Sequence, residues 1–93
     1  MIEFEWDDEK AADNLSKHGV RFELAAKAFR DPLAVDWIDD REDYAEERTV
    51  LLAMADGSIL VVVHTERDES IRLISARRAT KNEQDIYYRE NGA

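Results

Sequence analysis

The chain has 93 residues, of which 44% are hydrophobic and 38% charged, and it contains no cysteine. This composition is typical of a folded, water-soluble protein, and we expect residues 1–93 to form a single domain without disulfides or cysteine-bound metal. The start of the chain lacks the basic and apolar regions of a secretory signal, and no apolar run approaches the ~20 residues of a membrane span. The sequence therefore predicts a cytoplasmic protein.

The net charge of −9 is concentrated in the first half of the chain. Residues 1–47 contain 15 acidic and 6 basic residues, whereas residues 48–93 contain 7 of each. Because nonspecific DNA affinity comes from many phosphate contacts, we do not expect this acidic chain to bind DNA by itself. A small cationic site and a basic protein partner for the acidic half are both compatible with these numbers.

The N-terminal third predicts one strand and two helices. Residues 3–6 (EFEW) alternate polar and apolar side chains, which favours a short strand. Asp7 or Asp8 then provides a helix cap, and Lys17, His18 and Gly19 end that helix in the preferred order. Apolar residues at helical spacing predict a second helix over residues 22–30, which Pro32 terminates.

The middle of the chain predicts a short strand or extended segment over residues 33–38 (LAVDWI), followed by an exposed acidic connector. Residues 36–47 hold seven acidic residues and one basic residue. We expect Trp37, like Trp6, to pack in the core.

The second half predicts an antiparallel meander and a helix. Asp56-Gly57 joins residues 48–55 to 58–65 through a type I′ turn, and ERDE (66–69) forms a four-residue loop before a strand over residues 70–77. Thr80 and Glu83 form a capping box that opens a helix over residues 80–90. The fold class is therefore α+β, with an N-terminal strand and two helices, an antiparallel β-meander and a C-terminal helix.

This register distributes the basic residues of the strands over both faces of the sheet. It places Arg48 opposite Thr65 and Arg72 opposite Val63, so that one face presents Arg48, Thr65 and Arg72. The other face then presents His64, Ile71, Leu73, Ser75 and Arg77.

Several of these side chains are suited to holding a phosphate and moving protons without metal. Arginine binds phosphate bidentately, and histidine, lysine or tyrosine can transfer protons. Each residue also has a structural interpretation: Arg72 in a surface ion pair, Arg77 in a buried one, His18 at the core edge and Tyr87 packing the last helix. No histidine or carboxylate lies at metal-ligand spacing from His64, so we expect no metal site and no cofactor.

Two blocks, FEWDDEKAADNLSKHGVRFELAAKAFRDP and TERDESIRLISARRATKNE, together with Tyr87, closely resemble the BrnT family of toxins over nearly the whole chain. The resemblance implies a RelE-like fold and a type II toxin–antitoxin toxin that acts as a metal-independent endoribonuclease on mRNA and arrests translation. The implied partner is a BrnA-like antitoxin with a ribbon-helix-helix domain, through which alone the complex would bind operator DNA.

The resemblance also indicates site residues. The family's recurrent polar positions fall on Lys17, His18, Arg48, Arg67, Arg72, Arg77 and Tyr87. We expect Arg72 and Arg77, with Arg67 or Arg48, to hold the scissile phosphate, and His18 or Tyr87 to transfer protons while Lys17 stabilises charge. Arg78 is a further candidate for substrate binding. The alternative is a non-catalytic protein of the same fold that binds the antitoxin and acts only in operon repression, which the acidity of residues 1–47 favours.

Overall fold

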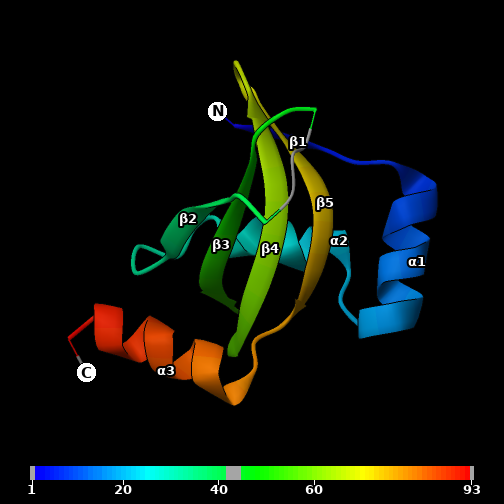
Figure 1. Cartoon of the computed structure of the whole chain (residues 1–93). Helices are drawn as coiled ribbons and strands as arrows, with labels where there is room; N and C mark the ends of the chain where they lie inside the picture. Colours follow the sequence, from blue (N-terminus) through cyan, green and yellow to red (C-terminus); the bar gives the residue numbers. More distant parts are fainter. Residues whose placement is uncertain (1, 42–44, 93) are drawn as a thin grey trace.

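The computed structural model describes residues 2–41 and 45–92, so residues 42–44 of the predicted acidic connector lie outside the described residues. Within these ranges, five strands form one mixed sheet and three helices pack against it, in agreement with the predicted α+β class (Figure 1). The elements in chain order are β1 (Glu3–Glu5), α1 (Asp8–His18), α2 (Phe22–Ala28), β2 (Val35–Asp39), β3 (Arg48–Ala55), β4 (Ser58–Arg67), β5 (Ser70–Arg78) and α3 (Lys81–Glu90).

The sheet has the order β1-β5-β4-β3-β2. Strands β2 to β5 form the predicted antiparallel meander, and β1 adds to it in parallel beside β5. The β3–β4 hairpin has the predicted register, with Ala55 opposite Ser58. Asp56 and Gly57 both have positive φ angles, 47° and 82°, as a type I′ turn requires.

The predicted four-residue loop ERDE is wrong. Strand β4 continues to Arg67, which pairs with Ser70, so only Asp68 and Glu69 form the turn. Arg72 therefore lies opposite Thr65 rather than Val63. The shift is an even number of residues, so Arg72 and Thr65 still share one face of the sheet, as predicted.

A β-bulge at Ile74 overturns the predicted placement of Ser75 and Arg77. Leu73 pairs with His64, but Ser75 pairs with Val63, so β5 contains one extra residue at this point. A bulge shifts the alternation of side chains along its strand. Ser75 and Arg77 consequently lie on the same face as Arg72, and not on the face of Leu73.

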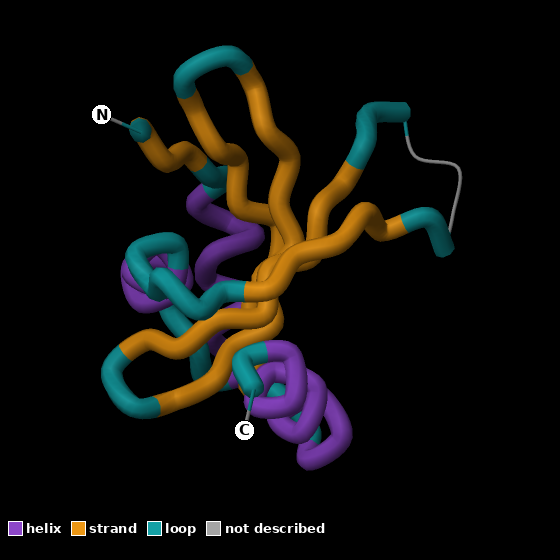
Figure 2. Tube along the Cα trace, turned by 90° about the vertical axis from the view of Figure 1, so that its left-hand side faces the viewer, coloured by secondary structure: helices purple, strands orange, loops and turns teal. Residues whose placement is uncertain are grey.

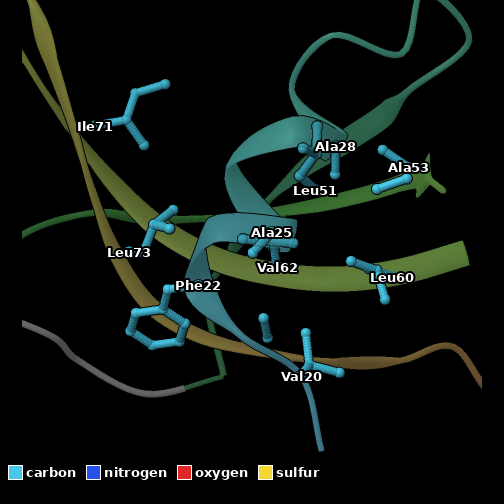
Figure 3. Close-up of a cluster of buried hydrophobic side chains, with 12 residues drawn as sticks. Val20, Phe22, Ala25, Ala28, Leu51, Ala53, Leu60, Val62, Ile71 and Leu73 are labelled. Carbon is cyan, nitrogen blue, oxygen red and sulfur yellow. The ribbon is translucent and has the colours of Figure 1, made fainter. Parts of the chain in front are cut away.

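The two faces of the sheet are covered differently. Helices α1 and α2 lie on one face and α3 on the other (Figures 1 and 2). Phe22, Ala25 and Ala28 of α2 pack on Leu51, Val62, Leu73 and their neighbours in the larger core cluster (Figure 3). The smaller cluster joins Tyr87 of α3 to Val50, Leu52, Ile59 and Val61. Because α3 is short and covers one end of its face, the other end stays accessible.

Helix α1 is fixed by local and tertiary hydrogen bonds. Asp7 caps its N-terminus by accepting from the backbone amides of Glu9 and Lys10, and Gly19 ends it in the left-handed conformation, as predicted. Buried Asn14 donates to the carbonyl of Ala76 at 2.8 Å and accepts from the amide of Ala76 at 3.0 Å. These bonds attach α1 to β5 and thereby fix the position of His18 relative to the sheet.

Candidate active site

A cleft of about 380 Å³ lies on the sheet face that carries α3. Val50, Val61 and Val63 form its apolar floor, on β3 and β4 in the middle of the sheet. Ser75 and Arg77 line it from β5, and β2 lines it from the opposite edge of the sheet. The remaining lining residues come from the end of α1, from the segment after β2 and from α3: His18, Trp37, Asp39, Asp40, Arg41 and Glu83.

His18 is the residue that α1 contributes to this cleft. It is half-buried at the last position of the helix. Lys17 next to it is exposed and lines an adjoining hollow of about 190 Å³, whose lining also includes His18 and Ser75. The structure thus brings together a histidine, a lysine and a hydroxyl at one end of the cleft.

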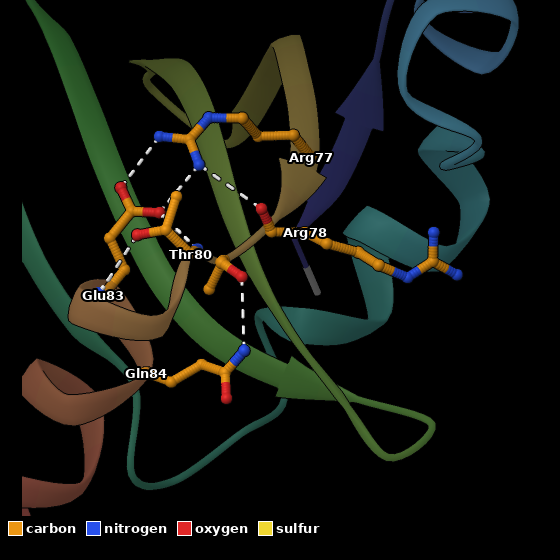
Figure 4. Close-up of polar contacts among 6 residues, drawn as sticks. Arg77, Arg78, Thr80, Glu83 and Gln84 are labelled. Atoms are coloured by element: carbon orange, nitrogen blue, oxygen red, sulfur yellow. Dashed lines mark hydrogen bonds and ion pairs between the residues drawn. The ribbon is translucent and has the colours of Figure 1, made fainter.

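Arg77 supplies the cleft with a guanidinium group that is held by Glu83 (Figure 4). Its Nη1 and Nη2 atoms donate to the two carboxylate oxygens of Glu83 at 2.7 and 2.8 Å. The hydrogen bond from Arg77 lowers the pKa of Glu83 to about 2, although partial burial acts in the opposite direction. Glu83 also accepts from the Thr80 amide, so the predicted capping box and the ion pair share one carboxylate.

The arginines at the other end of the same face form a second group outside the cleft lining. Arg67 donates to Glu46 at 2.9 Å, and both Arg67 and Arg72 approach Oε1 of Glu5, at 3.7 and 3.5 Å. Arg48 pairs in register with Asp39 of β2. The sequence predicted that Arg48 and Arg72 share a face, and the bulge places Arg77 on that face as well.

Arg78 and Tyr87 lie elsewhere among the described residues. The side chain of Arg78 points away from Arg77 (Figure 4), and its Nη1 lies 3.8 Å from the position that a Cβ on Gly19 would occupy. The hydroxyl of Tyr87 donates to Asp31 at 2.6 Å outside the cleft. Burial and this bond raise the pKa of Tyr87 to about 12.

Sequence reasoning missed three features of the site. Trp37, expected in the core, is 41% exposed and lines the cleft from β2, which lies at the edge of the sheet. Asp39 is buried and binds the guanidinium of Arg41 through both oxygens, at 2.8 and 2.9 Å. The third feature is the pairing of Arg77 with Glu83. The helix start directly after β5 was a signal for this pairing, but only the bulge places Arg77 on the face that α3 covers.

The match with known families covers this site. Residues 6–83 match the family model described as ribonuclease toxin, BrnT, of type II toxin-antitoxin system. The chain belongs to the BrnT family. The matched range includes His18, Arg77 and Glu83, whereas Tyr87 lies beyond it. Membership assigns the chain to the ribonuclease toxins of type II toxin–antitoxin systems, which implies an RNA substrate and an antitoxin partner. No curated protein matches the chain.

Residues 2–41 and 45–92 contain neither a cluster of metal-ligating side chains nor a membrane-spanning helix. Within these ranges no group of three or more histidine, aspartate or glutamate side chains is placed to hold a metal ion. The helices described there are too short or too polar to cross a membrane.

Proposed function

We propose that this chain is a cytoplasmic, metal-independent endoribonuclease that cleaves mRNA and arrests translation. The observation that carries the proposal is the placement of His18 and Arg77 in one cleft of a BrnT-family chain. Of the two histidines in the sequence, His64 is 2% exposed, so His18 is the imidazole that a substrate reaches.

The proposed reaction uses the ribose 2′ hydroxyl as the nucleophile. His18 takes its proton, the bond between O2′ and phosphorus forms, and the bond between phosphorus and O5′ breaks. The departing O5′ takes a proton from solvent. Arg77 stabilises the charge that develops on the phosphate oxygens, and Lys17 adds positive charge at the same end of the cleft.

The arginines outside the cleft extend this proposal along the substrate. Arg48, Arg67 and Arg72 lie toward the opposite end of the strands from Arg77, on the same face of the sheet. We assign them to phosphates that flank the scissile one, because arginine forks bind phosphate oxygens strongly. Tyr87 and Arg78 do not line the cleft, and the proposed reaction assigns them no role.

The test is cleavage of single-stranded RNA by purified protein in the presence of EDTA. Wild type should yield products with 2′,3′-cyclic phosphate and 5′-hydroxyl ends. His18→Gln and Arg77→Gln should each reduce the rate by about 100-fold or more. Arg89→Gln, which alters an exposed arginine of α3, should cleave like wild type. Cleavage by His18→Gln at the wild-type rate would contradict the proposal.

We also propose that the antitoxin is a BrnA-like ribbon-helix-helix protein and that the complex binds operator DNA only through it.

One observation favours a purely regulatory protein instead of a ribonuclease: carboxylates already pair with Arg77 and Arg67. Induction of this chain alone distinguishes the two. Growth arrest that Arg77→Gln or a co-expressed antitoxin relieves supports the ribonuclease, whereas normal growth with folded protein supports the co-repressor.

A further inference from the structure

Trp37 lines the cleft and stays partly exposed, whereas its hydrophobicity alone would place it in the core. The register aligns Trp37 with Val50, Val63 and Ser75 in one row across β2, β3, β4 and β5. All four residues line the cleft, and Arg77 lies two residues beyond Ser75 on the same face. The indole is therefore placed at the far end of the cleft from the proposed catalytic groups.

The exposure of Trp37 distinguishes it from the other tryptophan. Trp6 is partly buried and contacts Phe22 edge-on, with ring centroids 5.8 Å apart. Trp37 remains 41% exposed, although a tryptophan gains a large free energy from burial. A partly exposed indole beside an apolar floor is suited to contact a flat, partly apolar group, and a nucleobase is such a group.

Because carboxylates line the cleft, an uncharged contact with RNA is more important there. Arg41 and Arg77 each bind a carboxylate through two oxygens, with Asp39 and Glu83 respectively. Asp40 adds a further acidic side chain to the lining. In a protein of net charge −9, repulsion from these carboxylates opposes the phosphate contacts, whereas base stacking is independent of this charge.

We propose that Trp37 is a stacking platform for an unpaired base of single-stranded RNA and positions the strand across the cleft. The proposal rests on the proposed ribonuclease function, because it assigns the substrate of that site. With one base on the indole, the strand crosses the valine floor toward Ser75, and a phosphate reaches Arg77 and His18. Trp37 is thus a positioning residue that acts on binding more than on the chemical step.

The test measures binding separately from cleavage. A short RNA of mixed sequence with 2′-O-methyl riboses cannot react, because its 2′ oxygen has no proton to lose. In a Trp6→Phe background Trp37 is the single tryptophan, so stacking should quench its fluorescence on titration. Fluorescence anisotropy of labelled RNA then compares Trp37→Phe, Trp37→Ala and the control Ile38→Ala. Ile38 is the next residue of β2, 55% exposed, and pairs with Thr49 on the other face.

The expected result is about 10-fold or weaker binding by Trp37→Ala, near wild-type binding by Trp37→Phe and no change with Ile38→Ala. On cleavable RNA, KM should rise more than kcat falls. Unquenched fluorescence, or wild-type RNA affinity in Trp37→Ala, overturns the proposal, and loss of antitoxin binding alone would make Trp37 a protein contact. Stacking without any cleavage of normal RNA would instead overturn the ribonuclease function and leave the binding site in place.

Discussion

Glu83 connects β5 to the start of α3 through its bonds to Arg77 and to the Thr80 amide. Glu83→Gln removes the charge from these bonds and should lower the free energy of unfolding by about 2 kcal/mol, since hydrogen bonds to charged groups contribute that much. Urea unfolding at neutral pH measures the loss. Asp85→Asn, which removes an exposed carboxylate paired with Lys81 on the same helix, should change it by less than ~1 kcal/mol.

The contribution of Glu83 should also depend on pH. Its pKa is about 2 in the folded protein, below the ordinary value of 4.5. A lowered folded-state pKa contributes stability that is present above pH 4.5 and is lost as the pH falls toward 2. The difference in stability between wild type and Glu83→Gln should therefore shrink over this range, and a constant difference would contradict the assignment.

His64 should make the free energy of unfolding depend on pH at higher pH values than Glu83 does. Burial on the α2 face, edge-on to Phe29 at 4.8 Å, lowers its pKa below 6.5. The neutral form is therefore favoured in the folded protein, and stability is lost as the pH falls below 6.5. His64→Leu should remove this loss and leave the stability at neutral pH within about 1.5 kcal/mol of wild type. Urea unfolding of both proteins on either side of pH 6.5 tests this, and an unchanged acid loss in His64→Leu would exclude His64 as its source.

At the scale of elements, the Asn14 side chain supplies hydrogen bonds to β5 beyond the residues that pair with β1. Strand β1 pairs with β5 only over residues 70–72, and the Asn14 side chain bonds both the amide and the carbonyl of Ala76 farther along β5. Asn14→Ala leaves these buried groups without their partner, so it should cost about 3 kcal/mol. It should also weaken RNA cleavage, because α1 carries His18. Asp13→Ala, at an exposed neighbouring position, is the matched control, and equal stability of both variants would contradict this role.

The elements themselves were predictable because their signals are local. Asp7, Gly19, Asp56-Gly57 and the Thr80 capping box each fix a boundary within a few residues, and the structure confirms them. The bulge at Ile74 and the short turn at Asp68 were not predictable, because they depend on contacts between distant segments. The bulge decides the face of Arg77. The sequence therefore pointed to His18 and Arg77 as candidates, but it predicted neither their arrangement nor the presence of Trp37 and Asp39 in the cleft.

At the scale of the whole molecule, carboxylates offset the positive charge of several arginines of the proposed site. Glu5 and Glu46 approach Arg67, Glu5 approaches Arg72, and Glu83 binds Arg77. Glu5 and Glu46 belong to the acidic half of the chain, which thereby supplies partners to Arg67 and Arg72, whereas Arg77 has its partner within the second half. This arrangement favours a substrate held by a few specific contacts over one attracted by a broad positive surface.

The salt dependence of RNA binding tests whether a few specific contacts hold the substrate. A protein that contacts few phosphates releases few counterions, so the logarithm of the association constant should fall with the logarithm of salt concentration with a slope of roughly −2. Screening of the repulsion between the RNA and the net charge of −9 should make the slope shallower still. Fluorescence anisotropy over a series of KCl concentrations gives this slope. Arg72→Gln should reduce it by less than one, whereas a wild-type slope of about −5 or steeper would indicate a continuous cationic track that the pairing of these arginines does not provide.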